Sequence, residues 1–379
     1  PPAGTRPRGP TEHLSTMTFR TFARTCAAVA IATPLFAQDP ERVTIHGFLT
    51  QGAAFADTLS ILGIPKAGTT DYRAAALQFR ARVSDSRSFV IQLSHKRVGT
   101  SVINEAQDDV ELDWAFFQQN YGTGNVRIGR FAIPTGIYNE IRDAGVVLPF
   151  FRAPFNQYTE GVETMDGVRT TQTLFGSSKF PLEVSAYAGG FDFKVPQAVP
   201  TGRVLVRDRA DRAIGGQVWM RTPIQGVRVG YGAQRFSMPT FALLGQTTRG
   251  DGWLGRGSID ASTERVILRG ESVRFQFEQF RYDAQMVQVG VKPTEKLGLW
   301  YQLDNADISS LITLPTGRVP LSYDFARSNG VSANYAFSPQ FVGRLEAHFN
   351  KGYLFDVFTA PIAPARTGNY YIASVAVSF

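Results

Sequence analysis

The chain has 379 residues, including 36 Gly, 29 Phe and 13 Tyr, and 19% of its residues are charged. This composition is typical of a protein with many strands and turns, and no long apolar helix is evident. The formal net charge of +7 falls to +4, with 35 basic and 31 acidic residues, when residues 1–37 are set aside. Because the bases are scattered along the chain and form no patch, nucleic-acid binding is not expected.

The first 37 residues are predicted to lie outside the folded domain. Residues 1–16 show no structural pattern, whereas 17–37 have the features of a secretory signal peptide, with Arg20 and Arg24 before a short apolar core. That core is too short to cross a bilayer as a helix. Cleavage before Gln38 is the predicted processing step.

The predicted mature domain, residues 38–379, contains no cysteine, because Cys26 is the only cysteine of the chain. It can therefore form neither a disulfide nor a thiolate metal site.

Alternation of polar and apolar residues between turn residues predicts sixteen strands in this domain. They are 42–54, 72–84, 89–96, 110–120, 126–130, 167–175, 182–192, 211–221, 227–235, 262–270, 273–281, 284–292, 297–304, 322–337, 341–350 and 369–379. Long loops are predicted at 55–71, 193–210, 236–261, 305–321 and 351–368. An even strand number, with short turns at one end and long loops at the other, indicates an all-β transmembrane antiparallel barrel.

The two faces of the predicted strands differ in a way that favours a membrane barrel over a soluble sandwich. A sandwich shows water a face rich in Lys, Glu, Ser and Thr, whereas here the polar face is mostly Arg, Gln, Gly and Ser. The apolar face ends in aromatic residues near the turns: Trp114, Phe116, Tyr335, Phe337, Phe341 and Phe379. This pattern predicts an aromatic girdle around a lipid-facing band, with a wet interior.

One long interval, residues 131–166, interrupts the strands. Pro134, Pro149 and Pro154 exclude it from a ladder, and its aromatic residues give it apolar surface to bury. It is acidic, with Glu140, Asp143, Glu160, Glu163 and Asp166 against Arg142 and Arg152. Loops of this length are usually functional, so this interval is predicted to fold into the barrel as a constriction loop.

The last strand alternates with Tyr371 and Val377 on one face and ends the chain on Phe379. A terminal Phe on such a strand resembles the sorting signal of Gram-negative outer-membrane barrels. Together with Gly47-Phe48, the long third loop and Arg127-Ile128-Gly129-Arg130-Phe131 running into Pro134-Thr135-Gly136, the predicted mature chain resembles the bacterial porins.

The resemblance implies a sixteen-stranded homotrimeric barrel in outer-membrane lipid, recognised through its C-terminal strand by the barrel-assembly machinery. It also implies passive diffusion of small hydrophilic solutes and ions, without a cofactor. Porins are similar in setting loop carboxylates across the pore from an arginine ladder. The predicted basic wall consists of Arg80, Arg82, Arg127, Arg228, Arg274 and Arg344, and the near balance of charge predicts weak selectivity leaning towards anions.

Two alternatives remain. A substrate-specific anion channel for phosphate or dicarboxylates would use an arginine track as binding sites, which an acidic loop does not favour. An outer-membrane enzyme would need a nucleophile and base, for which His46, His95 and His348 are the candidates. Neither a Gly-x-Ser-x-Gly elbow nor a His-Glu-x-x-His motif occurs, so an enzyme is not expected.

Overall fold

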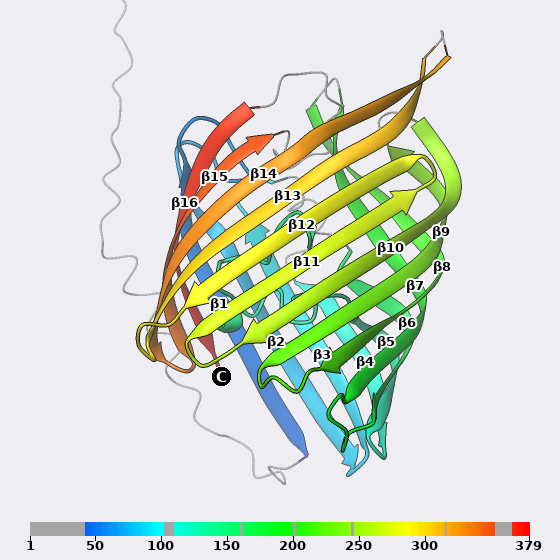
Figure 1. Ribbon diagram of the computed structural model, residues 1–379, viewed down its shortest axis with the longest axis vertical. Helices are drawn as coiled ribbons and strands as arrows, with labels where there is room; N and C mark the ends of the chain where they lie inside the picture. The colour runs from blue at the N-terminus through cyan, green and yellow to red at the C-terminus, as the bar shows by residue number, and fades with distance from the viewer. Residues whose placement is uncertain are drawn as a thin grey trace, which may run out of the picture. The chain divides into compact units, whose positions relative to one another are not determined.

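The computed structural model describes residues 42–101, 110–159, 162–199, 202–243, 246–314, 317–352 and 366–379. Within these residues, sixteen strands form one closed antiparallel barrel (Figure 1). Each strand pairs with its neighbours in the chain, and β1 pairs with β16 to close the sheet. Closure leaves no edge strand with unpaired backbone groups. The predicted segments 1–16 and 17–37 lie outside the described residues.

The strands have the following bounds: β1 (Val43–Ala56), β2 (Thr69–Ser84), β3 (Arg87–Val98), β4 (Glu111–Tyr121), β5 (Gly124–Ala132), β6 (Thr164–Leu174), β7 (Leu182–Val199), β8 (Gly202–Arg221), β9 (Val227–Leu243), β10 (Gln246–Ser262), β11 (Val266–Phe277), β12 (Phe280–Val291), β13 (Leu297–Leu314), β14 (Gly317–Ser338), β15 (Phe341–Gly352) and β16 (Arg366–Ser378). One 3₁₀ turn, η3 (Gly145–Val147), lies between β5 and β6. Among the described residues, no helix has the length and hydropathy needed to cross a membrane.

The two faces of the sheet carry opposite chemistry. On β12, Val287, Val289 and Val291 are 41%, 38% and 41% exposed, whereas Gln288 between them is fully buried. We name the face of the valines the outer face and the face of Gln288 the inner face. An exposed apolar face and a buried polar face are the reverse of a soluble sandwich and suit a barrel whose outside meets lipid.

The predicted number of sixteen strands is confirmed, but the prediction misses one strand and divides another into two, and these two errors leave the total unchanged. β10 occupies most of the segment predicted as a loop over 236–261, and the predicted strands 262–270 and 273–281 both overlap the single strand β11. The turn predicted at Gly270-Glu271 does not exist, because both residues continue the ladder with β12.

The glycines of β10 explain the missed strand. Gly252 lies under the ring of Phe236, and a Cβ there would stand 2.4 Å from the ring atom Cζ. A glycine at such a position lets the neighbouring ring lie close to the backbone and does not mark a turn.

Two other predicted loops are also strands. The segments 193–210 and 305–321 mostly extend the ladders of β7 with β8 and of β13 with β14. The predicted contrast between short turns and long loops therefore holds only for part of the barrel. The loop predicted at 351–368 lies mostly outside the described residues.

A β-bulge changes the predicted faces of β4. The register shifts between Gln92 and Leu93 of β3, so that Leu112 is 46% exposed while Phe116 is only 6% exposed. Phe117 takes the outer position and packs on Phe89, with ring centroids 5.2 Å apart. Phe116, predicted for the aromatic girdle, therefore lies on the inner face, because one extra residue inverts all positions beyond it.

The aromatic girdle is present at the end of the barrel where the chain terminates, which we name the turn end. Tyr335 and Phe341 both pack on Phe337, with centroids 5.0 and 4.8 Å from its ring. Phe379 is 66% exposed and closes the barrel through two backbone hydrogen bonds with Gly47, each 3.0 Å long. On β16, Tyr371 and Val377 share a face with the exposed Val375, as predicted.

Deleting Phe379 is expected to leave most of the protein in the periplasm or degraded, because the mutant loses the closing contacts with Gly47 and the end of the strand that we expect the insertion machinery to read. The measurement is the amount of heat-modifiable barrel in outer-membrane fractions. Phe341→Ser, in the same girdle, is the control and should still assemble. Wild-type levels of the deletion mutant in the membrane would contradict the assembly role.

Candidate functional site

Residues 133–163, which we name the inner segment, connect β5 to β6; 160–161 are outside the described residues. The segment is shorter than the predicted 131–166, because Phe131 and Asp166 belong to strands. Its hydrogen bonds reach ten strands: β2, β3, β6, β8, β10, β11, β12, β13, β14 and β15. These ten strands lie on all sides of the closed barrel. Because the segment bonds to all of them, we infer that it crosses the interior of the barrel.

Buried carboxylates of the wall hold the backbone of the inner segment. Three N–H groups donate to them: Ile137 to Glu271 at 3.0 Å, Asn156 to Asp304 at 3.0 Å and Phe151 to Glu346 at 2.7 Å. A buried carboxylate is costly unless its oxygens are hydrogen-bonded, and these contacts offset part of that cost. The same contacts satisfy backbone donors that no ladder reaches.

Buried arginines hold carbonyl oxygens of the same segment. Arg344 donates to the carbonyls of Gly145 and Leu148 at 2.6 and 2.7 Å. Arg256 donates to the carbonyl of Gln157 at 2.7 Å and pairs with Glu271 at 3.3 Å. The wall from β10 to β15 therefore fixes the inner segment through charges of both signs.

Tyr138 fastens the start of the inner segment to this wall. Burial raises the pKa of Tyr138 to about 12, so its hydroxyl stays protonated at neutral pH. The hydroxyl donates to Gln288 and accepts from Arg269, whose Nη1 lies 2.7 Å away.

Glu271→Ala is expected to lower the free energy of unfolding by about 3 kcal/mol, because it leaves Arg256 buried without its counterion. Glu271 also accepts from the hydroxyl of Tyr158, so the inner segment loses a second contact. The measurement is urea-induced unfolding of the barrel in lipid vesicles. Asp251→Ala is the control, because it breaks an exposed pair with Arg235 and should not move the midpoint. Equal midpoints for both variants would contradict the anchoring role of Glu271.

On the opposite side, the inner segment leaves a cavity of about 290 Å³ against β1–β4. The wall contributes His46, Gln78, Gln92 and Asp113, and the segment contributes Glu140 and Asp143 among others. Gln78 donates to Gln92 at 3.0 Å, and Gln92 donates to Asp113 at 2.6 Å. The cavity is thus lined by a fixed polar chain on one side and carboxylates on the other.

Wall cations face the carboxylates of the inner segment. Arg169 lies 2.5 Å from Glu140, and Arg127 lies 3.8 Å from the same oxygen. Lys96 lies 2.7 Å from Asp143. An acidic segment therefore meets a basic wall, with β3, β5 and β6 supplying the cations.

No protein-family model and no curated protein sequence matches this chain. Its fold is similar to that of the anion-selective porin from Comamonas acidovorans, with a TM-score of 0.55 and 13% identity over 89% of this chain and 99% of the other. OmpF of Salmonella typhi, solved with daunomycin, gives a TM-score of 0.58 and 12% identity over 89% and 97%. OmpT of Vibrio cholerae in a trimer form gives 0.52 and 11% over 89% and 99%.

The chain has the porin fold. Identities this low show the fold alone, so the solutes and partners of these proteins are not transferred to this chain by the likeness.

Of the predicted basic wall, only Arg127 forms an ion pair with a carboxylate of the inner segment among the described residues. Arg80 and Arg82 lie on the inner face of β2, in alternation with the exposed Leu77 and Val83. Both are exposed, and in the described part of the chain neither is bonded to the inner segment. The strand register nevertheless connects Arg82 through Ser88 and Gln118 to Arg127.

The other three predicted wall residues have different positions. Arg228 is on the inner face, pairs with Asp260 at 3.0 Å and stacks over Trp219 at 4.3 Å. Arg344 is a buried anchor of the inner segment and not a channel-lining residue. Arg274 is corrected to the outer face: because β11 continues through Gly270, Arg274 falls in step with the exposed Leu268.

The charged residues predicted for the constriction loop also divide. Arg142 braces the segment internally, donating to the carbonyl of Tyr158 at 2.7 Å. Arg152 donates to the hydroxyl of Tyr72 at 3.1 Å. Asp166 is corrected to β6, where it pairs with Arg130 at 2.8 Å.

Of the remaining loop carboxylates, Glu163 lines the cavity with Glu140 and Asp143 and lies 3.7 Å from Arg142. Glu160 lies outside the described residues.

Sequence reasoning missed Arg169, Arg256 and Glu271. Arg169 alternates with Val168, which is 47% exposed, and that period-two signal could have placed it on the inner face. Arg256 lies in β10, where the sequence predicts a loop, and Glu271 lies in β11, where the sequence predicts a turn. No pattern in the sequence indicates that these two residues meet the inner segment.

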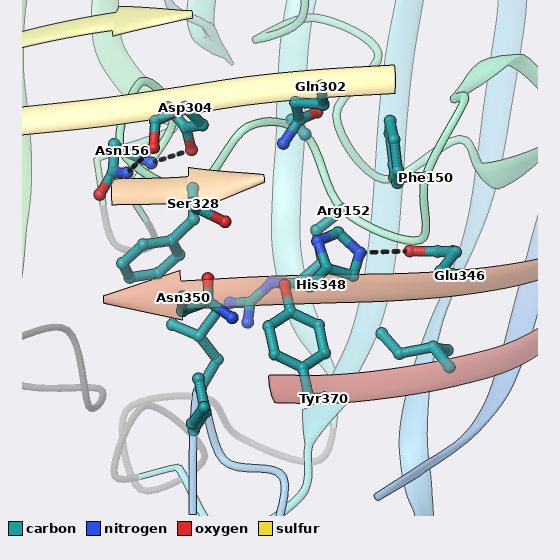
Figure 2. Close-up of a pocket in the computed structure, with 15 residues that line it drawn as sticks. Phe150, Arg152, Asn156, Gln302, Asp304, Ser328, Glu346, His348, Asn350 and Tyr370 are labelled. Carbon is teal, nitrogen blue, oxygen red and sulfur yellow. Dashed lines mark hydrogen bonds and ion pairs between the residues drawn. The ribbon is translucent and has the colours of Figure 1, made fainter. Parts of the chain in front are cut away.

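Among the described residues, His348 is bonded to a carboxylate and to no serine hydroxyl. Figure 2 shows His348 directed at Glu346, 3.0 Å away, and its ring stacks on Tyr370 with centroids 4.4 Å apart. Ser328 lines the same cavity, which has about 30 Å³ of free space, on the order of one water molecule. Among the described residues, no group of three or more His, Cys, Asp or Glu side chains is arranged to hold a metal ion.

Proposed function

We propose that this protein is a non-enzymatic porin that lets small hydrophilic solutes and ions diffuse across the outer membrane of a Gram-negative bacterium. The observation that carries the proposal is the charged cavity of about 290 Å³ between the inner segment and β1–β4. A barrel of sixteen strands is wide enough for an aqueous channel, and an inserted segment narrows it to a selective passage.

The charges at this passage support a weakly selective channel. Glu140 and Asp143 line the cavity and pair with Lys96, Arg127 and Arg169 just outside its lining, so the charges around the cavity nearly cancel. Charges of opposite sign across a narrow passage create a transverse field that favours polar solutes over apolar ones. The proposal therefore keeps weak selectivity with a slight lean towards anions.

The channel is proposed to work as a homotrimer embedded in outer-membrane lipid. The outer face near the barrel closure supports an interface, because small residues lie side by side there: Ala53 pairs with Ala373 across β1 and β16. Exposed Leu49 and Val375 add apolar surface to this area. Chemical cross-linking of membrane fractions, followed by electrophoresis without heating, tests the assembly.

Planar-bilayer recording of purified protein tests the function. Stepwise, ohmic conductance with a small reversal potential in a salt gradient is the expected result. A substrate-specific anion channel would instead show strong anion selectivity and block by phosphate or a dicarboxylate. Absence of conductance from correctly folded protein would contradict the porin function.

A further inference from the structure

A compact arginine cluster lies on the outer face of β11 and β12. Arg274 and Asp283 are direct cross-strand partners, and Arg274 Nε lies 2.6 Å from Asp283 Oδ1. Arg281, two residues along β12, bonds through its Nε to the other oxygen of the same carboxylate. Two arginines thus share one aspartate, and the cluster has one positive charge in excess.

The two guanidinium groups of this cluster have N–H donors left for a ligand. The Nε of each guanidinium donates a hydrogen bond to Asp283. In the described part of the chain the terminal Nη groups make no hydrogen bond. The side chains of Arg274 and Arg281 are 48% and 44% exposed. On the far side of Asp283, Asp307 pairs with Arg327 at 2.7 Å, and Arg327 also lies 3.2 Å from Asp324, so the proposed site depends on the free guanidinium donors and not on a net charge of the region.

The cluster lies at the border of the apolar outer face. On β12, Val291, Val289 and Val287 are exposed and are followed by Gln285 and then Asp283. From Val291 to Asp283 the tilted strand rises roughly 20 Å, close to the height of about 25 Å of a lipid-facing band. The guanidinium groups are thus positioned where lipid headgroups begin, at the end of the barrel opposite the turn end.

Beside the cluster, Trp253 of β10 lies over Gly255, whereas the outer face at Gly257 carries no large side chain. Gly257 of β10 pairs with Ser272 of β11, and Gly255 pairs with Arg274 itself. A Cβ built on Gly257 would meet no atom within 4 Å, so the surface there is open. Tyr231 on β9 and Val287 on β12, exposed by 61% and 41%, stand on either side.

We infer that Arg274 and Arg281 bind the phosphate of a phosphorylated lipid headgroup, with an acyl chain lying against Gly257 and Ser272. Guanidinium groups bind phosphate through paired, charge-assisted hydrogen bonds, and the unused Nη donors supply them. This site rests on the proposed location of the barrel in a membrane. It is independent of the channel, because it lies on the outer face and in strands away from the closure between β1 and β16.

Native mass spectrometry of the full chain in detergent, titrated with diphosphoryl lipid A or with the same lipid after dephosphorylation, tests the site. The wild-type protein should bind the phosphorylated lipid at least about tenfold more tightly. Arg274→Gln with Arg281→Gln should remove that preference. Ser272→Leu should weaken binding of both lipids, because its side chain fills the open surface.

Arg87→Gln is the matched control, since Arg87 is an exposed arginine bonded to Gln119 at the turn end. It should keep the preference for the phosphorylated lipid. An unchanged preference in the double variant, an equal loss in the control, or displacement of the lipid by equimolar inorganic phosphate would each overturn the inference. If the double variant does not fold, as judged by heat-modifiability, Arg281→Gln alone is measured. The lipid-binding experiment does not measure conductance. A protein that binds the lipid but conducts no ions would therefore contradict the channel function and leave the lipid site supported.

Discussion

Removal of residues 138–159, with the ends rejoined, is expected to raise single-channel conductance at least about twofold, because we infer that the inner segment crosses the interior of a wide barrel. The deletion also should admit larger sugars in a liposome-swelling assay. The physical basis is the set of contacts that hold this segment against β10–β15. Conductance equal to that of the wild type would show that the inner segment does not restrict the passage.

The deletion leaves several wall groups without their partners. Asp304 and Glu346 lose backbone donors, Glu271 loses the hydroxyl of Tyr158, and Arg344 loses the carbonyls of Gly145 and Leu148. In a widened, water-filled lumen these groups become hydrated, so the barrel itself should persist. The heat-modifiable band of the deletion protein checks this point before any recording is interpreted.

Replacement of Lys96, Arg127 and Arg169 by Gln is expected to turn the weak selectivity into a clear cation preference. These three cations stand 2.7, 3.8 and 2.5 Å from carboxylates of the inner segment, which would then face the passage unopposed. The Debye length is about 8 Å at physiological salt, so the effect should be large in dilute salt and fade as salt is added. The measurement is the reversal potential in a potassium chloride gradient.

The matched control for this experiment replaces Arg80 and Arg82 by Gln. Both are inner-face residues of β2 that make no ion pair with the inner segment in the described part of the chain. A smaller shift of the reversal potential is therefore expected. If the reversal potential of the control shifts as much as that of the triple variant, the basic wall includes β2, as the sequence alone predicts. If the reversal potential of the triple variant does not shift, Lys96, Arg127 and Arg169 do not line the passage.

The sequence by itself determined the barrel and the presence of a long non-strand segment between β5 and β6. Period-two alternation is a local property of each strand, so β2, β12 and β16 show their two faces without any knowledge of their neighbours. The prolines and carboxylates between β5 and β6 likewise exclude a strand there. The terminal strand and its last residue, Phe379, follow from the same local pattern.

Only the tertiary structure decided which side chains meet. A shift of one residue in register moves a side chain to the other face, and the bulge in β4 and the uninterrupted course of β11 reassigned Phe116 and Arg274 in this way. The anchors of the inner segment join residues far apart in the chain, such as Ile137 with Glu271 and Phe151 with Glu346. Such pairs depend on the closure of the sheet and the path of the segment across it, and neither leaves a local trace in the sequence.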